Sequence, residues 1–160
     1  MRVAAVALAV LLAPASGALA DPPPAPIVDP AALPFAVTLP PGVTVAMSNG
    51  PDFTVYYFQK GEQTLGGAYV GYAPQFGADL QSPGAATGFS EQRVKCDHGH
   101  ILSREIAIRF AQGSTEIVHA WTVEGPPQDA DAATADAILA TLHPPGRAPL
   151  TLYGPGKCPG

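Results

Sequence analysis

The stretch over residues 101–123 constrains the fold more than any other part of the chain. It reads ILSREIAIRFAQGSTEIVHAWTV, two alternating runs joined at Gln112-Gly113. Two-residue loops are the commonest hairpin connections, so a turn at Gln112-Gly113 predicts an antiparallel hairpin with Ile108 opposite Ile117. A four-residue loop is the alternative, because Gln-Gly is a weaker turn pair than Asn-Gly.

This register divides the hairpin into two faces, because side chains alternate along a strand. The apolar face would carry Arg104, Ile106, Ile108, Phe110, Ile117, His119 and Trp121. The other face would be mixed, with Arg109 opposite Glu116 as a cross-strand pair of opposite charge. A slip of one residue would destroy this division.

A second hairpin is predicted over residues 53–72. Its first strand, FTVYYFQK, is rich in aromatic and β-branched residues, and Gly61-Glu62 fits a type II′ turn. The expected cross-strand pairs are Phe58–Leu65, Tyr57–Gly66, Tyr56–Gly67, Val55–Ala68 and Phe53–Val70. The two tyrosines would cover strand glycines, a packing role rather than ligand stacking.

The remaining segments are shorter or irregular. Further strand candidates are residues 35–39, 43–47, 91–95 and 150–153. Residues 73–90 have no period and many Gly and Pro, which predicts a long loop of the kind that is often functional or mobile.

Residues 129–142, DADAATADAILATL, form the one good helix candidate. Asp129 or Asp131 can cap its start, and Pro144 prevents its continuation. An apolar stripe at helical spacing comprises Ala132, Ala135, Ile138, Leu139 and Leu142.

The order of these elements predicts the fold class α+β: an antiparallel β-sheet built from two hairpins, with one C-terminal helix packed on a face. Ile138 and Leu142 are expected to pack on the face that carries Ile106, Ile108, Ile117 and Trp121.

The first residues predict export. Arg2 precedes an apolar run too short for a confident membrane span, and Ala18-Leu19-Ala20 fits a signal-peptidase site. The expected organisation is a signal peptide at 1–20, a disordered Pro-rich leader at 21–34 and a single domain at 35–160. The protein would be periplasmic or secreted, with no membrane span after signal cleavage.

The composition of the chain limits the classes of partner that the protein is expected to bind. The formal net charge is −5 and the sequence shows no basic patch, which argues against nucleic acid. Cys96 and Cys158 are the only cysteines, and an oxidising compartment would favour a disulfide between them. In the chain-entropy model, that link would stabilise the fold by roughly 4 kcal/mol.

A pattern of several elements resembles a known group. A Pro-Gly turn after PFAVTL, two long late strands and a final helix ending AILATL are similar to exported PsbP/Mog1-like domains. The resemblance covers much of the chain as a pattern and implies an accessory or binding role. It carries over no functional residue, because no specific motif matches.

The densest group of ligand-type side chains is Cys96-Asp97-His98-Gly99-His100. A His-x-His pair can present two imidazoles to zinc or copper, with Asp97 as a further ligand or as an acceptor behind them. The alternative is a polar loop beside a disulfide, which would also remove Cys96 as a ligand. A third ligand such as His119, Asp79 or Glu91 would discriminate between the two.

His119 is interpreted as a core or edge histidine, since a base role needs a carboxylate and a pocket that the sequence does not locate. No nucleophile elbow, phosphate-binding glycine signature or His-Glu-x-x-His motif is present. The sequence therefore favours an exported non-catalytic domain that binds an unknown protein or small-molecule partner. A metal-binding protein or metalloenzyme built on His98 and His100 is the alternative.

Overall fold

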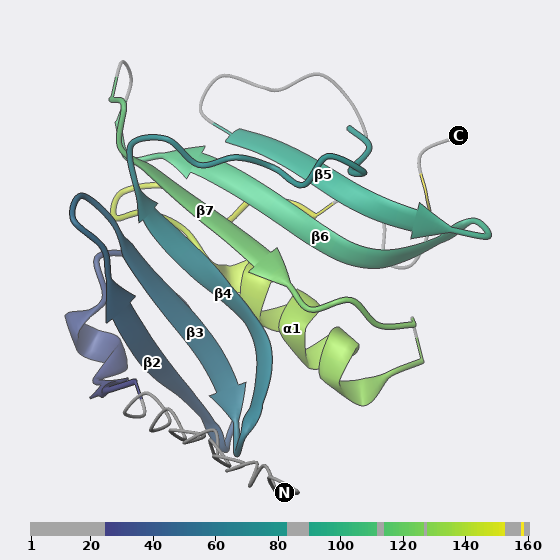
Figure 1. Ribbon diagram of the computed structural model, residues 1–160, viewed down its shortest axis with the longest axis horizontal. Helices are drawn as coiled ribbons and strands as arrows, with labels where there is room; N and C mark the ends of the chain where they lie inside the picture. Colours follow the sequence, from purple (N-terminus) through teal and green to yellow (C-terminus); the bar gives the residue numbers. More distant parts are fainter. Residues whose placement is uncertain (1–24, 83–89, 112–113, 127, 153–157, 159–160) are drawn as a thin grey trace, which may run out of the picture.

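A seven-stranded antiparallel sheet with one helix on one of its faces forms the core of the protein (Figure 1). The computed structural model describes residues 25–82, 90–111, 114–126, 128–152 and 158. The elements are β1 (Ile27–Val28), a 3-10 helix η1 (Pro30–Ala32), β2 (Val43–Asn49), β3 (Thr54–Lys60), β4 (Gln63–Gly71), β5 (Ser90–Asp97), β6 (His100–Arg109), β7 (Ile117–Thr122) and α1 (Ala130–Thr141).

The strand order is β1-β2-β3-β4-β7-β6-β5, and every neighbouring pair is antiparallel. The two expected hairpins, β3–β4 and β6–β7, meet through the pairing of β4 with β7. The α+β class is confirmed, although a sheet of two hairpins understates its extent, because β1, β2 and β5 add strands at both edges.

The register of the β6–β7 hairpin differs from the prediction by one residue. Ile108 pairs with Val118 and Arg109 with Ile117, so the expected Ile108–Ile117 and Arg109–Glu116 pairs are wrong. Gln112 and Gly113, the expected turn residues, lie outside the described residues. On either side of them Ser114 N donates to Ala111 O at 3.0 Å, but Phe110 N donates to Glu116 O at 3.2 Å. One extra residue between Ser114 and Glu116 therefore shifts all the pairing that follows.

This shift exchanges the two faces of β7. Val118, Ala120 and Thr122 lie with Ile106 and Ile108 on the helix side, where all five are buried. The expected positions of Ile117, His119 and Trp121 in the core are therefore wrong. These three side chains belong to the opposite face of the sheet.

The β3–β4 hairpin shows the same kind of deviation. Gly61 has a φ of 62°, as the first position of a type II′ turn requires, and Lys60 pairs with Gln63 as expected. A bulge after Phe58 then moves the pairing by one residue. The observed pairs are Phe58–Gly66, Tyr57–Gly67, Tyr56–Ala68, Val55–Tyr69 and Thr54–Val70.

Helix α1 confirms the sequence prediction closely. Asp129 is the N-cap, and its side chain accepts hydrogen bonds from the backbone N–H groups of Asp131 and Ala132. Four members of the predicted stripe are buried against the sheet, while Ala132 is partly exposed. The buried members are Ala135, Ile138, Leu139 and Leu142.

Several edge segments differ from their predictions. The sheet begins inside the expected leader, because Ile27 and Val28 pair with Ala46 and Val45. Residues 35–39 form only an isolated bridge from Ala36 to His143, and the described part of residues 150–153 forms no strand. The expected signal peptide at 1–20 lies outside the described residues.

The predicted disulfide joins Cys96, at the end of β5, to Cys158 near the C-terminus. The two Cα atoms are 5.9 Å apart. Cys158 N also donates to Gly99 O at 3.2 Å, so the tail is held to the β5–β6 turn by a covalent link and a hydrogen bond.

Within the described part of the chain, no helix is long and apolar enough to cross a membrane.

Candidate functional site

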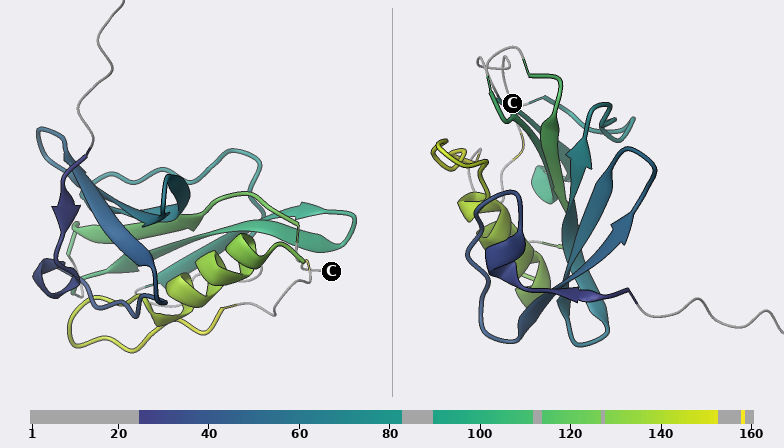
Figure 2. Two further views of the ribbon diagram at one scale, coloured as in Figure 1. Left: turned by 90° about the horizontal axis from the view of Figure 1, so that it is seen from below. Right: turned by 90° about the vertical axis from the view of Figure 1, so that its left-hand side faces the viewer.

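The face of the sheet opposite α1 carries the candidate site. Figure 2 shows α1 on one side of the sheet, while the loop after β4 runs across the other. This second side, here called the open face, contains a hollow of about 420 Å³. The hollow, here called the open-face pocket, is lined by Tyr69, Ala73, Pro74, Gln75, Glu105, His119 and Trp121.

Strand pairing explains why these side chains meet. Trp121 lies opposite Gly67 on one side and Glu105 on the other, and His119 lies opposite Tyr69. Paired residues point to the same face, so four pocket side chains come from three adjacent strands. A Cβ atom on Gly67 would lie 2.6 Å from Cζ2 of Trp121, so the indole ring requires a glycine beneath it.

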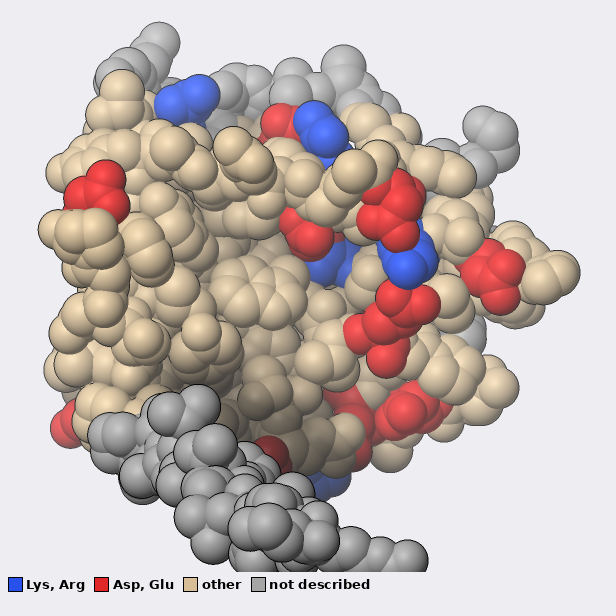
Figure 3. Space-filling model, in the orientation of Figure 1, with Lys and Arg blue, Asp and Glu red and all other residues tan. Residues whose placement is uncertain are grey.

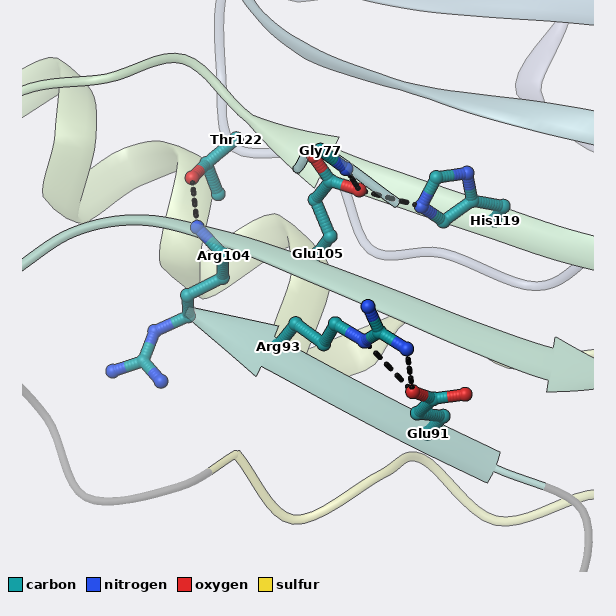
Figure 4. A network of polar contacts seen from close by, with 7 residues as sticks. All are labelled: Gly77, Glu91, Arg93, Arg104, Glu105, His119 and Thr122. Atoms are coloured by element: carbon teal, nitrogen blue, oxygen red, sulfur yellow. Dashed lines mark hydrogen bonds and ion pairs between the residues drawn. The ribbon is translucent and has the colours of Figure 1, made fainter. Parts of the chain in front are cut away.

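Glu105 and His119 form an acid–base pair in the pocket. Nε2 of His119 lies 2.8 Å from Oε2 of Glu105, and the side chains are 8% and 19% exposed respectively. Gly77 N, from the loop, donates to the same Oε2 at 3.4 Å. Figure 4 shows the carboxylate reaching both groups, while Arg104, the preceding residue of β6, points away from them.

Aromatic rings surround this pair. The Phe76 ring meets the His119 ring edge-on, with centroids 4.8 Å apart, and the Trp121 centroid lies 6.4 Å from the imidazole. Tyr69 stacks on Phe53 at 5.3 Å, so its ring is held from behind. The rings restrict the orientation of His119, and Tyr69 and Trp121 provide apolar walls for a ligand.

The cations near the pocket are paired with other carboxylates. Arg93 bonds Glu91 at 2.7 Å and lies 4.4 Å above the Phe76 ring. Lys95 contacts both Asp79 and Glu124, at 3.0 and 2.8 Å, and these two hydrogen bonds raise the pKa of Lys95.

Backbone hydrogen bonds also hold the loop after β4 in place. Gln81 and Val94 exchange two hydrogen bonds, of 2.7 and 2.9 Å. Together with the Lys95–Asp79 ion pair, this attaches the described part of the predicted 73–90 loop to β5. Residues 83–89 lie outside the described residues, so the rest of that loop prediction is untested.

The pair can present two kinds of polar atom to a ligand. If the Glu105 carboxylate accepts from Nε2–H, a neutral His119 keeps Nδ1 as an acceptor. Both hydrogen bonds that Glu105 accepts within the described residues end on Oε2, which leaves Oε1 for a further donor. The pocket can therefore accept hydrogen bonds from a ligand at two atoms.

The cluster predicted as a metal site lies elsewhere, in the turn between β5 and β6. His98 and Gly99 have φ values of 47° and 81°, as a type I′ hairpin turn requires. Nδ1 of His98 lies 2.8 Å from Oδ1 of Asp97, and this hydrogen bond raises the pKa of the fully exposed His98. Cys96 is committed to the disulfide.

The three proposed further ligands have other partners: His119 bonds Glu105, Asp79 bonds Lys95 and Glu91 bonds Arg93. Among the residues that the structure describes, no group of three or more His, Cys, Asp and Glu side chains could hold a metal ion. Metal binding by His98, His100 and Asp97 stays a prediction.

Sequence reasoning identified His119 but missed its partner and its pocket. The sequence indicated that a base role for His119 would need a carboxylate and a cavity. The structure contains both, in Glu105 and the open-face pocket. The one-residue shift in β7 hid them, because the predicted register placed His119 and Glu105 on opposite faces.

The chain was also compared with models of protein families, with curated proteins and with solved structures, and none of these matched it.

Proposed function

We propose that the chain is an exported, non-catalytic binding domain that holds a small organic ligand in the open-face pocket. The observation that carries the proposal is a hollow of about 420 Å³ with Tyr69 and Trp121 as walls and the Glu105–His119 pair as its polar group. Small-molecule sites are typically concavities of this size, with apolar linings and a few fixed polar atoms.

Export is supported by two features. Residues 1–20 have the basic start, short apolar run and small-residue site of a secretory signal. The Cys96–Cys158 disulfide is compatible with an oxidising compartment. The resemblance to exported PsbP/Mog1-like domains, a group of mostly accessory and binding proteins, agrees with both export and a binding role.

An enzyme that uses His119 as a general base is a second candidate. It is favoured by the 2.8 Å contact with Glu105, because a carboxylate that orients an imidazole is a recurring arrangement in acid–base catalysis. The lining residues include no Ser, Thr or Cys, so such an enzyme would have His119 activate water or remove a proton from the substrate. Turnover of a bound molecule that His119→Gln abolishes while binding remains would favour the enzyme.

The test uses a built-in reporter, because Trp121 is the only tryptophan in the chain. A library of small metabolites is screened by thermal shift, and each hit is titrated while tryptophan emission is recorded. A ligand that binds the folded state raises the unfolding midpoint, and one that enters the pocket also changes Trp121 emission.

Matched variants locate the hits. Trp121→Ala removes a wall of the pocket, while Tyr72→Ala removes an aromatic ring that is 58% exposed and does not line it. We expect hits to lose their thermal shift in Trp121→Ala and to keep it in Tyr72→Ala, with circular dichroism confirming that both variants fold. Hits that leave Trp121 emission unchanged and bind both variants equally would contradict the proposed site.

A further inference from the structure

The chemistry of the pocket atoms points to a ligand class, an inference that rests on the proposed function. Every buried side-chain polar atom in the described residues has a hydrogen-bond partner. Oε1 of Glu105 and Nδ1 of His119 form no hydrogen bond there, so both atoms are exposed to solvent, and both residues line the pocket. A ligand that satisfies both must bring hydrogen-bond donors.

Charge narrows the ligand further. Arg93 is paired with Glu91, and Lys95 is paired with Asp79 and Glu124. Arg93 is also the cross-strand partner of Glu105, but its guanidinium bonds Glu91 and lies over the Phe76 ring. The imidazole of His119 can donate from Nε2–H to the Glu105 carboxylate. Among the described residues no Lys or Arg side chain forms an ion pair with Glu105, so its carboxylate brings a negative charge to the pocket.

The aromatic walls of the open-face pocket also suit a positively charged group on the ligand. The faces of Trp and Tyr rings attract ammonium and guanidinium groups, and Trp121 and Tyr69 both line the pocket. The chain itself contains an example of this interaction, since the Arg93 guanidinium lies 4.4 Å from the centre of the Phe76 ring, which also meets the ring of His119.

We propose that the ligand is an organic cation with N–H donors, such as a primary ammonium attached to an apolar body. Its N–H groups donate to Oε1 of Glu105 and Nδ1 of His119, and its apolar body packs on Trp121 and Tyr69. A carboxylate ligand is disfavoured, because it would bring a second negative charge beside Glu105.

The experiment uses three small molecules that share one phenyl ring: phenethylamine (cation), 2-phenylethanol (neutral) and 3-phenylpropionate (anion). Each is titrated into the disulfide-bonded protein, with Trp121 excited at wavelengths that phenyl rings do not absorb. We expect phenethylamine to bind at least about tenfold more tightly than 2-phenylethanol, with the anion weakest.

Two isosteric variants separate the outcomes. Glu105→Gln should remove the advantage of the amine over the alcohol, while Glu62→Gln, a carboxylate in the exposed turn between β3 and β4 and away from the pocket, should keep it. Equal affinities for amine and alcohol, tighter binding of the anion, or no amine binding where the metabolite screen yields other pocket ligands would each overturn the cation proposal and leave the binding function standing. If that screen also finds no pocket ligand, both fail.

Discussion

Two acid–base pairs start from neighbouring residues of β6 and lie on opposite faces of the sheet. Arg104 points under α1, where Nε lies 2.9 Å from Oδ2 of Asp136 and the side chain is 1% exposed. Glu105 points to the open face, where its partner is His119 at 2.8 Å and its side chain is 19% exposed. Similar contact distances therefore occur in very different surroundings.

The covering layer decides what each pair can do. The helix face is closed by apolar side chains such as Ile138 and Leu139, so Arg104 is surrounded by packed protein, while its partner Asp136 is 36% exposed at the edge of the helix. Among the described residues, the loop after β4 crosses the open face, and the Glu105 pair borders a hollow. The first pair is thus placed to stabilise the fold, and the second borders the pocket in which we propose that a ligand binds.

The space-filling view extends this contrast across the open face itself. Figure 3 shows a largely uncharged surface over β2, β3 and β4, whereas Asp, Glu, Lys and Arg gather over β5 and β6. The open-face pocket lies between these two regions, since Tyr69 comes from β4 and Glu105 from β6. A ligand with a charged end and an apolar body matches both sides.

The largest expected effect tests which face holds the core. Ile108 is 3% exposed on the helix side, so Ile108→Ala should lower the free energy of unfolding by about 2–5 kcal/mol. Ile117→Ala, on the open face and partly exposed, should cost about 1 kcal/mol. Urea denaturation of both variants measures the difference, and equal costs would contradict the observed register.

A smaller effect tests the pair under the helix. Asp136→Asn removes the charge that faces buried Arg104 and should cost about 1–3 kcal/mol. Asp131→Asn is the control on the same helix, because its ion pair with the half-exposed Lys60 is worth under about 1 kcal/mol. If the two variants unfold at the same urea concentration, the Arg104 pair does not stabilise the fold more than a surface pair does.

The open-face pair should matter less for folding. Glu105→Gln keeps an oxygen that can accept from His119, so its cost in unfolding free energy should stay under about 1 kcal/mol. The same denaturation experiment measures it. A loss larger than that of Asp136→Asn would assign Glu105 a structural role and reverse the comparison.

The smallest effect concerns a third pair, Asp97–His98, in the exposed β5–β6 turn. The hydrogen bond that Nδ1 of His98 donates to the Asp97 carboxylate raises the pKa of His98, so an NMR titration should give a higher midpoint than in Asp97→Asn. A pKa raised in the folded state stabilises the fold at pH values below the unfolded pKa, and this contribution is lost as pH rises through the folded value. An unchanged midpoint in Asp97→Asn would mean that the pair does not persist in solution.

Local features of the fold were predictable because they depend on neighbours in sequence. The Asp129 cap, the apolar stripe of α1 and the Gly61 turn are all fixed within a few residues. The registers of the two hairpins were not predictable, since a single extra residue in one strand shifts every later pair. Both hairpins deviate in this way, and alternation alone does not indicate where a strand gains a residue.

The same one-residue shift is the reason that the candidate site was not predicted from the sequence. In β7 both phases of the alternation are plausible, since Ile117, His119 and Trp121 are apolar or aromatic and so are Val118 and Ala120. The helix packs over β4, β6 and β7, where the sheet presents the small residues Ala68 and Ala120. The bulky Trp121 lies on the open face. Which residues of β7 face the helix depends on contacts between distant parts of the chain.

The link between Cys96 and Cys158 also has a consequence for the order of biosynthesis. The two cysteines are separated by 62 positions, and the ring they close contains β6, β7 and α1, with both acid–base pairs of the sheet. Cys158 follows β6, β7 and α1 in the chain, so the link cannot form until all three elements have been synthesised. Any product that ends before residue 158 would therefore have an unpaired Cys96 thiol beside the β5–β6 turn.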